Sequence, residues 1–397
     1  MLEAEGERLL AFAEKAKDPR GGFAWLDDAG RPDPGEPRPL WVTARMTHCF
    51  ALASRRGRPG AADLAAHGVT ALAGPFRDAR HGGWYEALAD DGDPVTRTKS
   101  AYPHAFAILA AASATAAGID GAAALLDQAL DISARHFWDD RAAAVVETWS
   151  EDWADLDGYR GANANMHTVE AYLAAADVTG DAVWRQRAAR AAARFVDGAA
   201  RANGWRLPEH FTAAWEPLPD YNRDRPDDPF RPYGATVGHA LEWSRLVLQL
   251  GAALGEVAPE WAVGAAEALF NQAVEDGWDV DGAPGFVYTT DWAGQPVVRQ
   301  RMHWVAAEAV GAAATLAQVT GDPVAMARYV EWWNYIDRWL IDREHGSWRH
   351  ELDPANRPAA TVWRGKPDIY HAYQATLIPR LPVGPCLAVS VTTLGAA

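Results

Sequence analysis

The chain has 397 residues, of which 49% are hydrophobic and 23% are charged, a composition typical of a globular protein. Its 37 lysines and arginines stand against 53 aspartates and glutamates, which gives a formal charge of −16. This charge argues against nucleic acid as a partner, because binding phosphates requires a basic surface.

No segment approaches the roughly 18 apolar residues that a membrane span needs. The N-terminal stretch is acidic and amphipathic, and it lacks the apolar core of a signal peptide. Cys49 lies in an apolar helical stretch and Cys386 in the tail, so their spacing matches no metal or redox motif. We therefore predict a cytoplasmic protein without a membrane partner. The tail, residues 381–397, is broken by Pro and Gly, and we expect it to be packed or frayed.

A short motif, in which a glycine or apolar residue precedes aromatic residues, recurs along the whole chain. It begins at Gly22, Gly83, Val146, Gly204, Gly285 and Gly346. The intervals are 61, 63, 58, 81 and 61 residues. The one long interval contains residues 217–234, which are rich in Pro, Asp and Arg and which we interpret as an inserted loop.

Between these motifs lie Ala-rich stretches with the apolar period of an α-helix. In chain order, the predicted helices span 3–17, 40–56, 61–73, 100–117, 120–136, 163–178, 182–199, 238–253, 259–275, 303–319, 322–341 and 369–378. Turns such as Arg58-Pro59-Gly60 separate the partners of a pair. The sequence therefore predicts an all-α (α/α)6 barrel of six helical hairpins in inner and outer rings, with short β-hairpins at one end. It forms one domain over residues 1–397. An open solenoid is the alternative, but no polar capping repeat is present.

Six of the twelve histidines fall one per repeat, near the start of the helix that follows each motif. They are His48, His104, His167, His239, His303 and His371. In a closed ring those helix starts gather at one end of the central cavity. Imidazole suits proton transfer near neutral pH, and we expect two or three of the six to serve it.

Two groups of histidines are set aside. His303 is discounted because it is adjacent to Trp304 in the sequence and does not share its helix face, so both side chains cannot point inward equally. The remaining histidines fall in outer helices or hairpins and are interpreted as structural: His67, His81, His136, His210, His345 and His350.

Neighbouring positions on the helices combine aromatic and polar side chains on one face. The sets are Trp41 with Arg45 and His48, Asn163 with His167, His239 with Glu242, and Trp304 with Glu308. Stacking surfaces beside hydrogen-bonding groups favour a sugar pocket. Ordinary ion pairs and core tryptophans are the alternative, and the 19 tryptophans alone would fit a large core.

Other chemistries have weaker support. The chain has no Gly-rich phosphate loop, dinucleotide fingerprint or nucleophile elbow, so we expect no cofactor. His239 and Glu242 could be two metal ligands, but no third ligand stands out, and we expect no metal. Carboxylates suited to glycoside hydrolysis remain open in the hairpins: Glu86, Glu147, Glu151, Asp152, Glu209 and Asp291.

Seven long segments, spread over nearly the whole chain, are recognisable as a set. They are LWVTARMTH (40–48), GGWYEAL (82–88), RGANANMHTVEAY (160–172), EHFTAAWEPLPDYNRD (209–224), FRPYGATVGHALEWSRL (230–246), VYTTDWAGQPVVRQR (287–301) and GKPDIYHAYQATLIPR (365–380). With these segments the chain resembles the N-acylglucosamine 2-epimerase superfamily. Within it, the chain resembles the aldose–ketose isomerase branch, whose members act on D-mannose or sulfoquinovose.

The resemblance implies an (α/α)6 barrel and a metal-free mechanism. It places two principal acid/base histidines at His239 and His371, and a third at His167 that assists ring opening or holds sugar oxygens. The substrate contacts that it implies fall on Trp41, Arg45, Tyr102, Asn163, Arg231, Glu242, Trp304 and Glu308.

The chain departs from the sulfoquinovose enzymes at two places. Position 367 is Pro where Gln is expected, and residues 372–374 after His371 also differ. We therefore expect a neutral hexose, D-mannose converted to D-fructose, with D-lyxose to D-xylulose as a side activity. In this mechanism His371 moves the proton between C2 and C1, and His239 shuttles the proton between O1 and O2.

Three other functions remain open from the sequence. The first is a 2-epimerase of the same superfamily, acting on cellobiose or N-acylglucosamine. The second is an (α/α)6 glycoside hydrolase, and the third is a sugar-binding protein without catalysis. A homo-oligomer and a lid formed by residues 217–234 also remain open.

Overall fold

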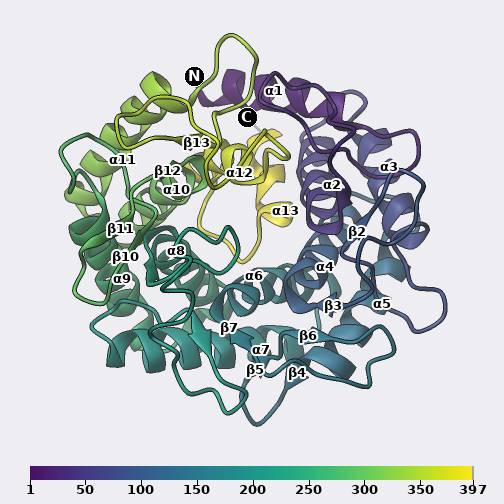
Figure 1. The fold of residues 1–397 in the computed structure, drawn as a ribbon, viewed down its shortest axis with the longest axis horizontal. Helices are drawn as coiled ribbons and strands as arrows, with labels where there is room; N and C mark the ends of the chain where they lie inside the picture. The colour runs from purple at the N-terminus through teal and green to yellow at the C-terminus, as the bar shows by residue number, and fades with distance from the viewer. Residues whose placement is uncertain (396–397) are drawn as a thin grey trace.

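The computed structural model describes residues 1–395, which form a closed ring of helices (Figure 1). The inner helices are α2 (Leu40–Arg55), α4 (Ala101–Ala116), α6 (Ala162–Thr179), α8 (Val237–Leu254), α10 (His303–Thr320) and α12 (Tyr370–Leu377). The outer helices are α1 (Leu2–Ala13), α3 (Ala61–Ala73), α5 (Ala122–Ile132), α7 (Ala182–Ala192), α9 (Trp261–Gly277) and α11 (Pro323–Tyr335). The predicted (α/α)6 barrel is confirmed, and all twelve predicted helices are present.

Each of the first five inner helices packs against the outer helix that follows it, α2 against α3 and so on around the ring. The sixth inner helix, α12, packs against α1, so the two ends of the chain close the ring (Figure 1). Three outer helices, α5, α7 and α11, continue beyond their α-helical parts as π-helical turns at 133–137, 193–200 and 336–340. The predicted ends at 136, 199 and 341 include these turns.

The two rings differ in burial, and the sequence shows why. Inner helix α4 buries 13 of its 16 residues, whereas outer helix α5 buries five of its 11 residues along one face. An inner helix is surrounded by neighbours, and alanine lets those neighbours approach closely on every side. Outer helices keep the one-sided apolar stripe of a surface helix. Their starts are defined by local signals, such as Asp322, whose side chain accepts the N–H of Val324.

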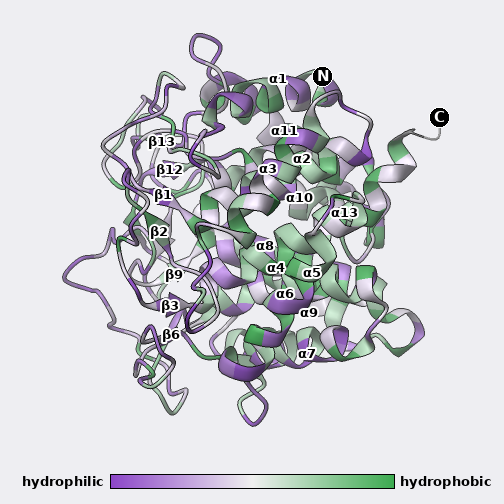
Figure 2. Cartoon of the chain, turned by 90° about the vertical axis from the view of Figure 1, so that its right-hand side faces the viewer, coloured by the Kyte–Doolittle hydropathy of each residue, from purple (hydrophilic) through white to green (hydrophobic). Residues whose placement is uncertain are grey.

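Short antiparallel strand pairs gather at one end of the helices, as predicted (Figure 2). Five strands directly precede inner helices: β1 (Arg38–Pro39), β3 (Lys99–Ser100), β7 (Arg160–Gly161), β9 (Ala235–Thr236) and β12 (Arg301–Met302). Their partners are β2 (Ala87–Leu88), β6 (Thr148–Trp149), β8 (His210–Phe211), β10 (Thr289–Thr290) and β13 (Glu351–Leu352). The remaining strands are β4 (Trp138–Asp139), β5 (Ala144–Val145) and β11 (Pro296–Val298). This pairing places the N-terminal ends of the inner helices at the hairpin end of the ring.

The tail is packed rather than frayed as far as residue 395. It forms the short helix α13 (Leu387–Ser390) and a 3₁₀ turn (Val391–Gly395), and α13 contacts α2, α4 and α6. It lies at the end of the ring away from the strands (Figure 2). Residues 396 and 397 of the predicted tail lie outside the described residues. Within residues 1–395, no helix has both the length and the apolar character required to cross a membrane.

Candidate active site

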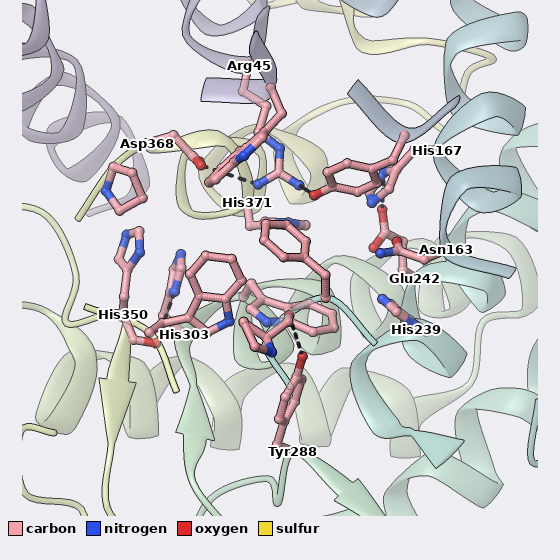
Figure 3. Close-up of a pocket in the computed structure, with 17 residues that line it drawn as sticks. Arg45, Asn163, His167, His239, Glu242, Tyr288, His303, His350, Asp368 and His371 are labelled. Atoms are coloured by element: carbon pink, nitrogen blue, oxygen red, sulfur yellow. Dashed lines mark hydrogen bonds and ion pairs between the residues drawn. The ribbon is translucent and has the colours of Figure 1, made fainter. Parts of the chain in front are cut away.

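The hairpin end of the ring contains a cavity of about 670 Å³ (Figure 3). All six inner helices contribute side chains to its wall, together with the inserted loop and the segment before α12. Nine of the eleven predicted site residues line it: Trp41, Arg45, Tyr102, Asn163, His167, His239, Glu242, Trp304 and His371. Ring closure therefore brings together side chains from the whole length of the chain.

The other two predicted residues, Arg231 and Glu308, do not line this cavity. The Arg231 guanidinium lies 4.0 Å from the ring centre of Tyr159, in an adjoining chamber. Glu308 lies one turn beyond Trp304 on α10 and contacts the imidazole of His371. Glu308 therefore acts on a bound ligand through neighbouring residues such as His371, and Arg231 lies outside the cavity wall.

His371 is held by a buried carboxylate. Its Nδ1 lies 2.8 Å from Glu308 Oε1, and the other oxygen of Glu308 accepts a hydrogen bond from Arg245 Nε at 3.0 Å. Burial, together with the positive charge of Arg45, holds the pKa of His371 well below its ordinary value. The imidazole is therefore neutral near pH 7. When Nδ1–H is donated to the carboxylate, Nε2 is the basic atom.

His239 has a similar partner from a different part of the fold. Its Nδ1 lies 3.0 Å from Oε1 of Glu209, which is buried in the hairpin directly before β8. The ring centroids of His239 and His371 lie 5.2 and 5.6 Å from that of Trp304. Two imidazoles with carboxylates on Nδ1 therefore lie against one indole ring.

His167 faces two further buried carboxylates. Its Nδ1 lies 3.7 Å from Glu242 Oε1 and 3.9 Å from Glu170 Oε2, and burial lowers the pKa of His167 to about 4. Burial, and then the negative charge of Glu308, raise the pKa of Glu242 well above its ordinary value. Within residues 1–395, neither Glu242 oxygen has a hydrogen-bond partner. This shift favours the protonated carboxyl group, which can donate a hydrogen bond to a ligand.

Arg45 brings a fixed positive charge to the cavity wall. Its Nη2 donates to the Tyr102 hydroxyl at 2.9 Å, and its Nη1 lies 3.3 Å from Asp368 Oδ2. The guanidinium carbon also lies 4.3 Å from the ring centre of Phe106. Because these contacts fix the guanidinium in advance, it can stabilise negative charge that develops on a ligand oxygen.

The structure corrects the predictions for His303 and His350. His303, which was discounted, lines the cavity together with Trp304. The expectation that Trp304 excludes His303 was wrong because His303 is the first residue of α10, directly after β12, and both side chains line the cavity. His350, which was interpreted as structural, also lines the cavity, and its ring stacks on that of His303 with centroids 3.7 Å apart.

Two of the six repeat-related histidines lie elsewhere. His48 Nδ1 is 2.7 Å from Ser113 Oγ in the interior of the ring. His104 Nδ1 is 2.7 Å from the carbonyl oxygen of Ser100, and its Nε2 accepts the N–H of Trp84. Neither imidazole lines the cavity. Four of the six repeat-related histidines therefore line the cavity.

Sequence reasoning missed a structural position that five hairpin residues share, although it had named Glu86, Glu147 and Glu209 as open carboxylates. The backbone carbonyl of each accepts the first N–H of an inner helix: Glu86 from Leu40, Glu147 from Ala101, Glu209 from Ala162, Tyr288 from Val237 and His350 from His303. Most lie two residues after a hairpin residue that forms an isolated bridge, as in Trp84-x-Glu86 and Trp348-x-His350. This offset from the hairpin aromatic was a signal that could have found Glu86, Tyr288 and His350, but not Glu147 or Glu209, which follow Val145 and Leu207.

A second chamber of about 1350 Å³, partly open to solvent, adjoins the cavity. The two share Trp41, Tyr102, Asn163, Phe230 and Trp363 as wall residues. Phe230 comes from the inserted loop and packs on Trp363, with ring centroids 5.1 Å apart. None of the six hydrolase candidates lines the inner cavity, and only Glu86 and Glu147 line the outer chamber.

Ligand atoms for a metal ion also lie close together around the cavity. Two buried groups have such atoms within 4.8 Å: His167 with Glu170 and Glu242, and Glu242 with Glu308 and His371. Arg245 lies among these carboxylates, with Nη2 3.0 Å from Glu308 and 3.5 Å from Glu242. Its guanidinium supplies positive charge at this point, and His239, the suggested ligand, belongs to neither group. That the protein works without a metal stays a prediction.

Known proteins with sequences similar to this chain include two D-mannose isomerases. A D-mannose isomerase of Thermobifida fusca is 51% identical over 395 residues, which cover 99% of this chain and 97% of that protein. A D-mannose isomerase of Pseudomonas cannabina pv. alisalensis is also 51% identical, covering 99% of this chain and 95% of that protein.

Solved structures with a similar fold also include a D-mannose isomerase. The crystal structure of a D-mannose isomerase matches with a TM-score of 0.89 and 30% sequence identity, covering 96% of this chain and 97% of that chain. The profile of the N-acylglucosamine 2-epimerase family matches residues 21–375. On this evidence the chain belongs to the N-acylglucosamine 2-epimerase (GlcNAc 2-epimerase) family.

Proposed function

We propose that this protein is an aldose–ketose isomerase that interconverts D-mannose and D-fructose through an enediol, with histidines as the acid and base. The observation that carries this proposal is the arrangement of His239 and His371. Both imidazoles lie against Trp304 in one cavity, and each has its Nδ1 on a buried carboxylate. The relatives that are named D-mannose isomerases support the same choice.

The proposed reaction begins with ring opening, assisted by His167 or His239. Nε2 of His371 then removes the proton from C2 of the open-chain aldose, and the electron pair left behind forms the C1=C2 bond of the enediol. His239 gives a proton to O1 and takes the proton from O2. His371 returns its proton to C1, C2 becomes the carbonyl carbon of the ketose, and neither histidine has gained or lost a proton overall.

The weak acidity of the C2–H bond makes stabilisation of the enediol oxygens necessary. Arg45 is the fixed cation in the cavity wall, and Glu242 is a carboxylic acid that can donate a hydrogen bond. Groups aimed in advance at developing charge contribute strongly in a cavity that excludes water. We infer that Arg45 and Glu242 bind the O1 and O2 side of the substrate.

The wall of the cavity favours a neutral monosaccharide. Pro367 lines it and contributes no side-chain donor at the position where the resemblance to sulfoquinovose enzymes leads us to expect Gln. Phe230 and Trp363 lie where the cavity meets the outer chamber, and these two aromatic side chains separate an inner space that we expect to hold a single sugar. D-lyxose, which matches D-mannose without the last carbon, is the expected second substrate.

The second candidate is a sugar 2-epimerase, because the same enediol becomes an epimer when C2 is reprotonated from the opposite face. The test is to incubate the protein with D-mannose, D-lyxose, sulfoquinovose and cellobiose in parallel and to identify the products by chromatography. D-fructose as the main early product of D-mannose supports the isomerase. D-glucose as the main early product would show a 2-epimerase, and turnover of cellobiose alone would overturn the proposed substrate.

A further inference from the structure

The two carboxylates that hold the imidazoles differ in their charge balance. Glu308 forms an ion pair with Arg245, with Nη2 and Oε2 3.0 Å apart. Glu209, which is 4% exposed, contacts the imidazole of His239, with Oε1 and Nδ1 3.0 Å apart. Among residues 1–395, no lysine or arginine forms an ion pair with Glu209. One imidazole therefore faces a carboxylate that is paired with an arginine, and the other faces a carboxylate that has no lysine or arginine partner among residues 1–395.

This difference matters because the proposed reaction needs two different protonation states at its start. The group that removes the C2 proton must be a neutral imidazole, and the group that gives a proton to O1 must be an imidazolium. A buried carboxylate on Nδ1 fixes the ring orientation and stabilises positive charge on the imidazole. A carboxylate that also pairs with an arginine stabilises positive charge on the imidazole less strongly.

We propose that Glu209 is a positioning residue that orients His239 with Nε2 toward the sugar oxygens and maintains it as the imidazolium that protonates O1. Glu308, balanced by Arg245, leaves His371 as the neutral base. The inference rests on the proposed function and deepens it, because it explains why two imidazoles with the same kind of partner perform opposite tasks.

Other titratable groups surround this pair and are part of the same environment. Tyr159 and His210 approach from the hairpin side, with Tyr159 Oη 2.7 Å from His210 Nδ1. Tyr288, directly before β10, lies near Glu209, and His167 on α6 lies near His239. Glu242 on α8 lines the same cavity as His239, and Arg231 of the inserted loop lies near His210. His210 has its own partners in Tyr159 and the carbonyl of Pro232, at 2.8 Å from Nε2, and so does not compete for Glu209.

The test compares the wild-type protein with Glu209→Gln in steady-state kinetics on D-mannose over a range of pH. The amide oxygen can still accept the Nδ1–H, so the orientation of His239 is retained while the negative charge is lost. We expect kcat to fall about 10-fold with KM within about 2-fold, at the low end of what acid–base catalysis contributes. We also expect the basic limb of the pH–kcat profile to move to lower pH by about one unit.

The matched control is Glu147→Gln, a repeat-equivalent buried carboxylate whose Oε2 accepts the Gly161 N–H at 3.1 Å and that contacts no imidazole. Its profile should keep the wild-type basic limb. An active Glu209→Gln variant with an unmoved basic limb would overturn this inference and leave the proposed function standing. A wild-type protein that does not interconvert D-mannose and D-fructose would overturn both.

A measurement on the wild-type protein covers the case in which Glu209→Gln does not fold. Nitrogen-15 NMR of labelled histidines, assigned with a His239→Gln variant, reports which ring nitrogens carry protons at neutral pH. Both nitrogens of His239 should be protonated, whereas His371 should carry a proton on Nδ1 alone. A neutral His239 under the same conditions would overturn the inference.

Discussion

The two sides of the cavity perform the same local task with different parts of the fold. On one side, His371 (α12), Glu308 (α10) and Arg245 (α8) are joined entirely within the inner ring. On the other side, His239 is held by Glu209, a hairpin residue whose backbone carbonyl also accepts the first N–H of α6. One imidazole is positioned by helix packing alone, and the other by pairing between a hairpin and the ring.

The comparison shows that similar hydrogen bonds need not give similar chemistry. The carboxylate on the His371 side lies in a network with a guanidinium, whereas the carboxylate on the His239 side is paired, within residues 1–395, with its imidazole alone. The presence or absence of an arginine beside each carboxylate can therefore determine which imidazole is the neutral base and which is the cationic acid.

Arg245→Met removes the guanidinium that lies among three buried carboxylates: Glu170, Glu242 and Glu308. Taking one partner from a buried ion pair leaves an uncompensated charge, and we expect the free energy of unfolding to fall by about 3–5 kcal/mol. Urea unfolding measures this, and adding Glu308→Gln to the variant should restore part of the loss. A single variant within about 1 kcal/mol of wild type would show that Arg245 does not balance this group.

Glu308→Gln should lower kcat on D-mannose by about 100-fold. The amide can keep a hydrogen bond to His371 Nδ1, but it no longer favours the tautomer in which Nε2 is basic, and it leaves Arg245 without its partner. The expected loss exceeds the 10-fold loss for Glu209→Gln, because His371 performs the difficult proton transfer from carbon. Steady-state kinetics of the two variants side by side check the order. The opposite order would contradict the distinction between the two sides.

Stability should rise with pH between about 4 and 6.5. Burial lowers the pKa of His48, His167 and His303 to about 4 and that of His104 to about 3. In this range the unfolded chain binds protons that the folded protein excludes, which costs about 1.4 kcal/mol per histidine and pH unit. Urea unfolding at pH 5 and pH 7 should show a free energy at least about 2 kcal/mol lower at pH 5. Equal or greater stability at pH 5 would contradict the neutral, buried state of these imidazoles.

Removal of metal ions should have the smallest effect. Arg245 supplies positive charge among the carboxylates, and the proposed mechanism uses no ion. We expect kcat after exhaustive EDTA treatment to stay within about 2-fold of the untreated value, since no step loses a catalytic group. Activity that disappears with EDTA and returns with one divalent ion would place the ion at one of the two carboxylate–imidazole groups.

Much of the ring could be predicted from sequence because the same local pattern repeats six times. The helix starts and the inner or outer position of each helix follow from that pattern, and Arg45, His239 and His371 follow from helix faces and family resemblance. The π-helical ends of the outer helices could not be separated from the α-helical parts, because both carry the same apolar period. That residues 1–397 form one domain stays a prediction.

The remaining site residues come from contacts between repeats. Glu209, Tyr288 and His350 reach the cavity region because their hairpins pair with the strands before the neighbouring inner helices. Periodicity within one helix does not report this pairing. His303 was misplaced for a related reason, since a residue at the very start of a helix is positioned by the strand before it as well as by the helix.

The central claim is that His371 removes the proton from C2, and the most direct measurement is hydrogen exchange. D-mannose is incubated in D2O with the EDTA-treated wild-type protein, His371→Ala and His239→Ala, and proton NMR follows the C2 hydrogen and the products. The account predicts D-fructose with deuterium at C1 for wild type, slow residual exchange at C2 for His239→Ala, and no exchange above background for His371→Ala. Exchange by His371→Ala at the wild-type rate would contradict the account.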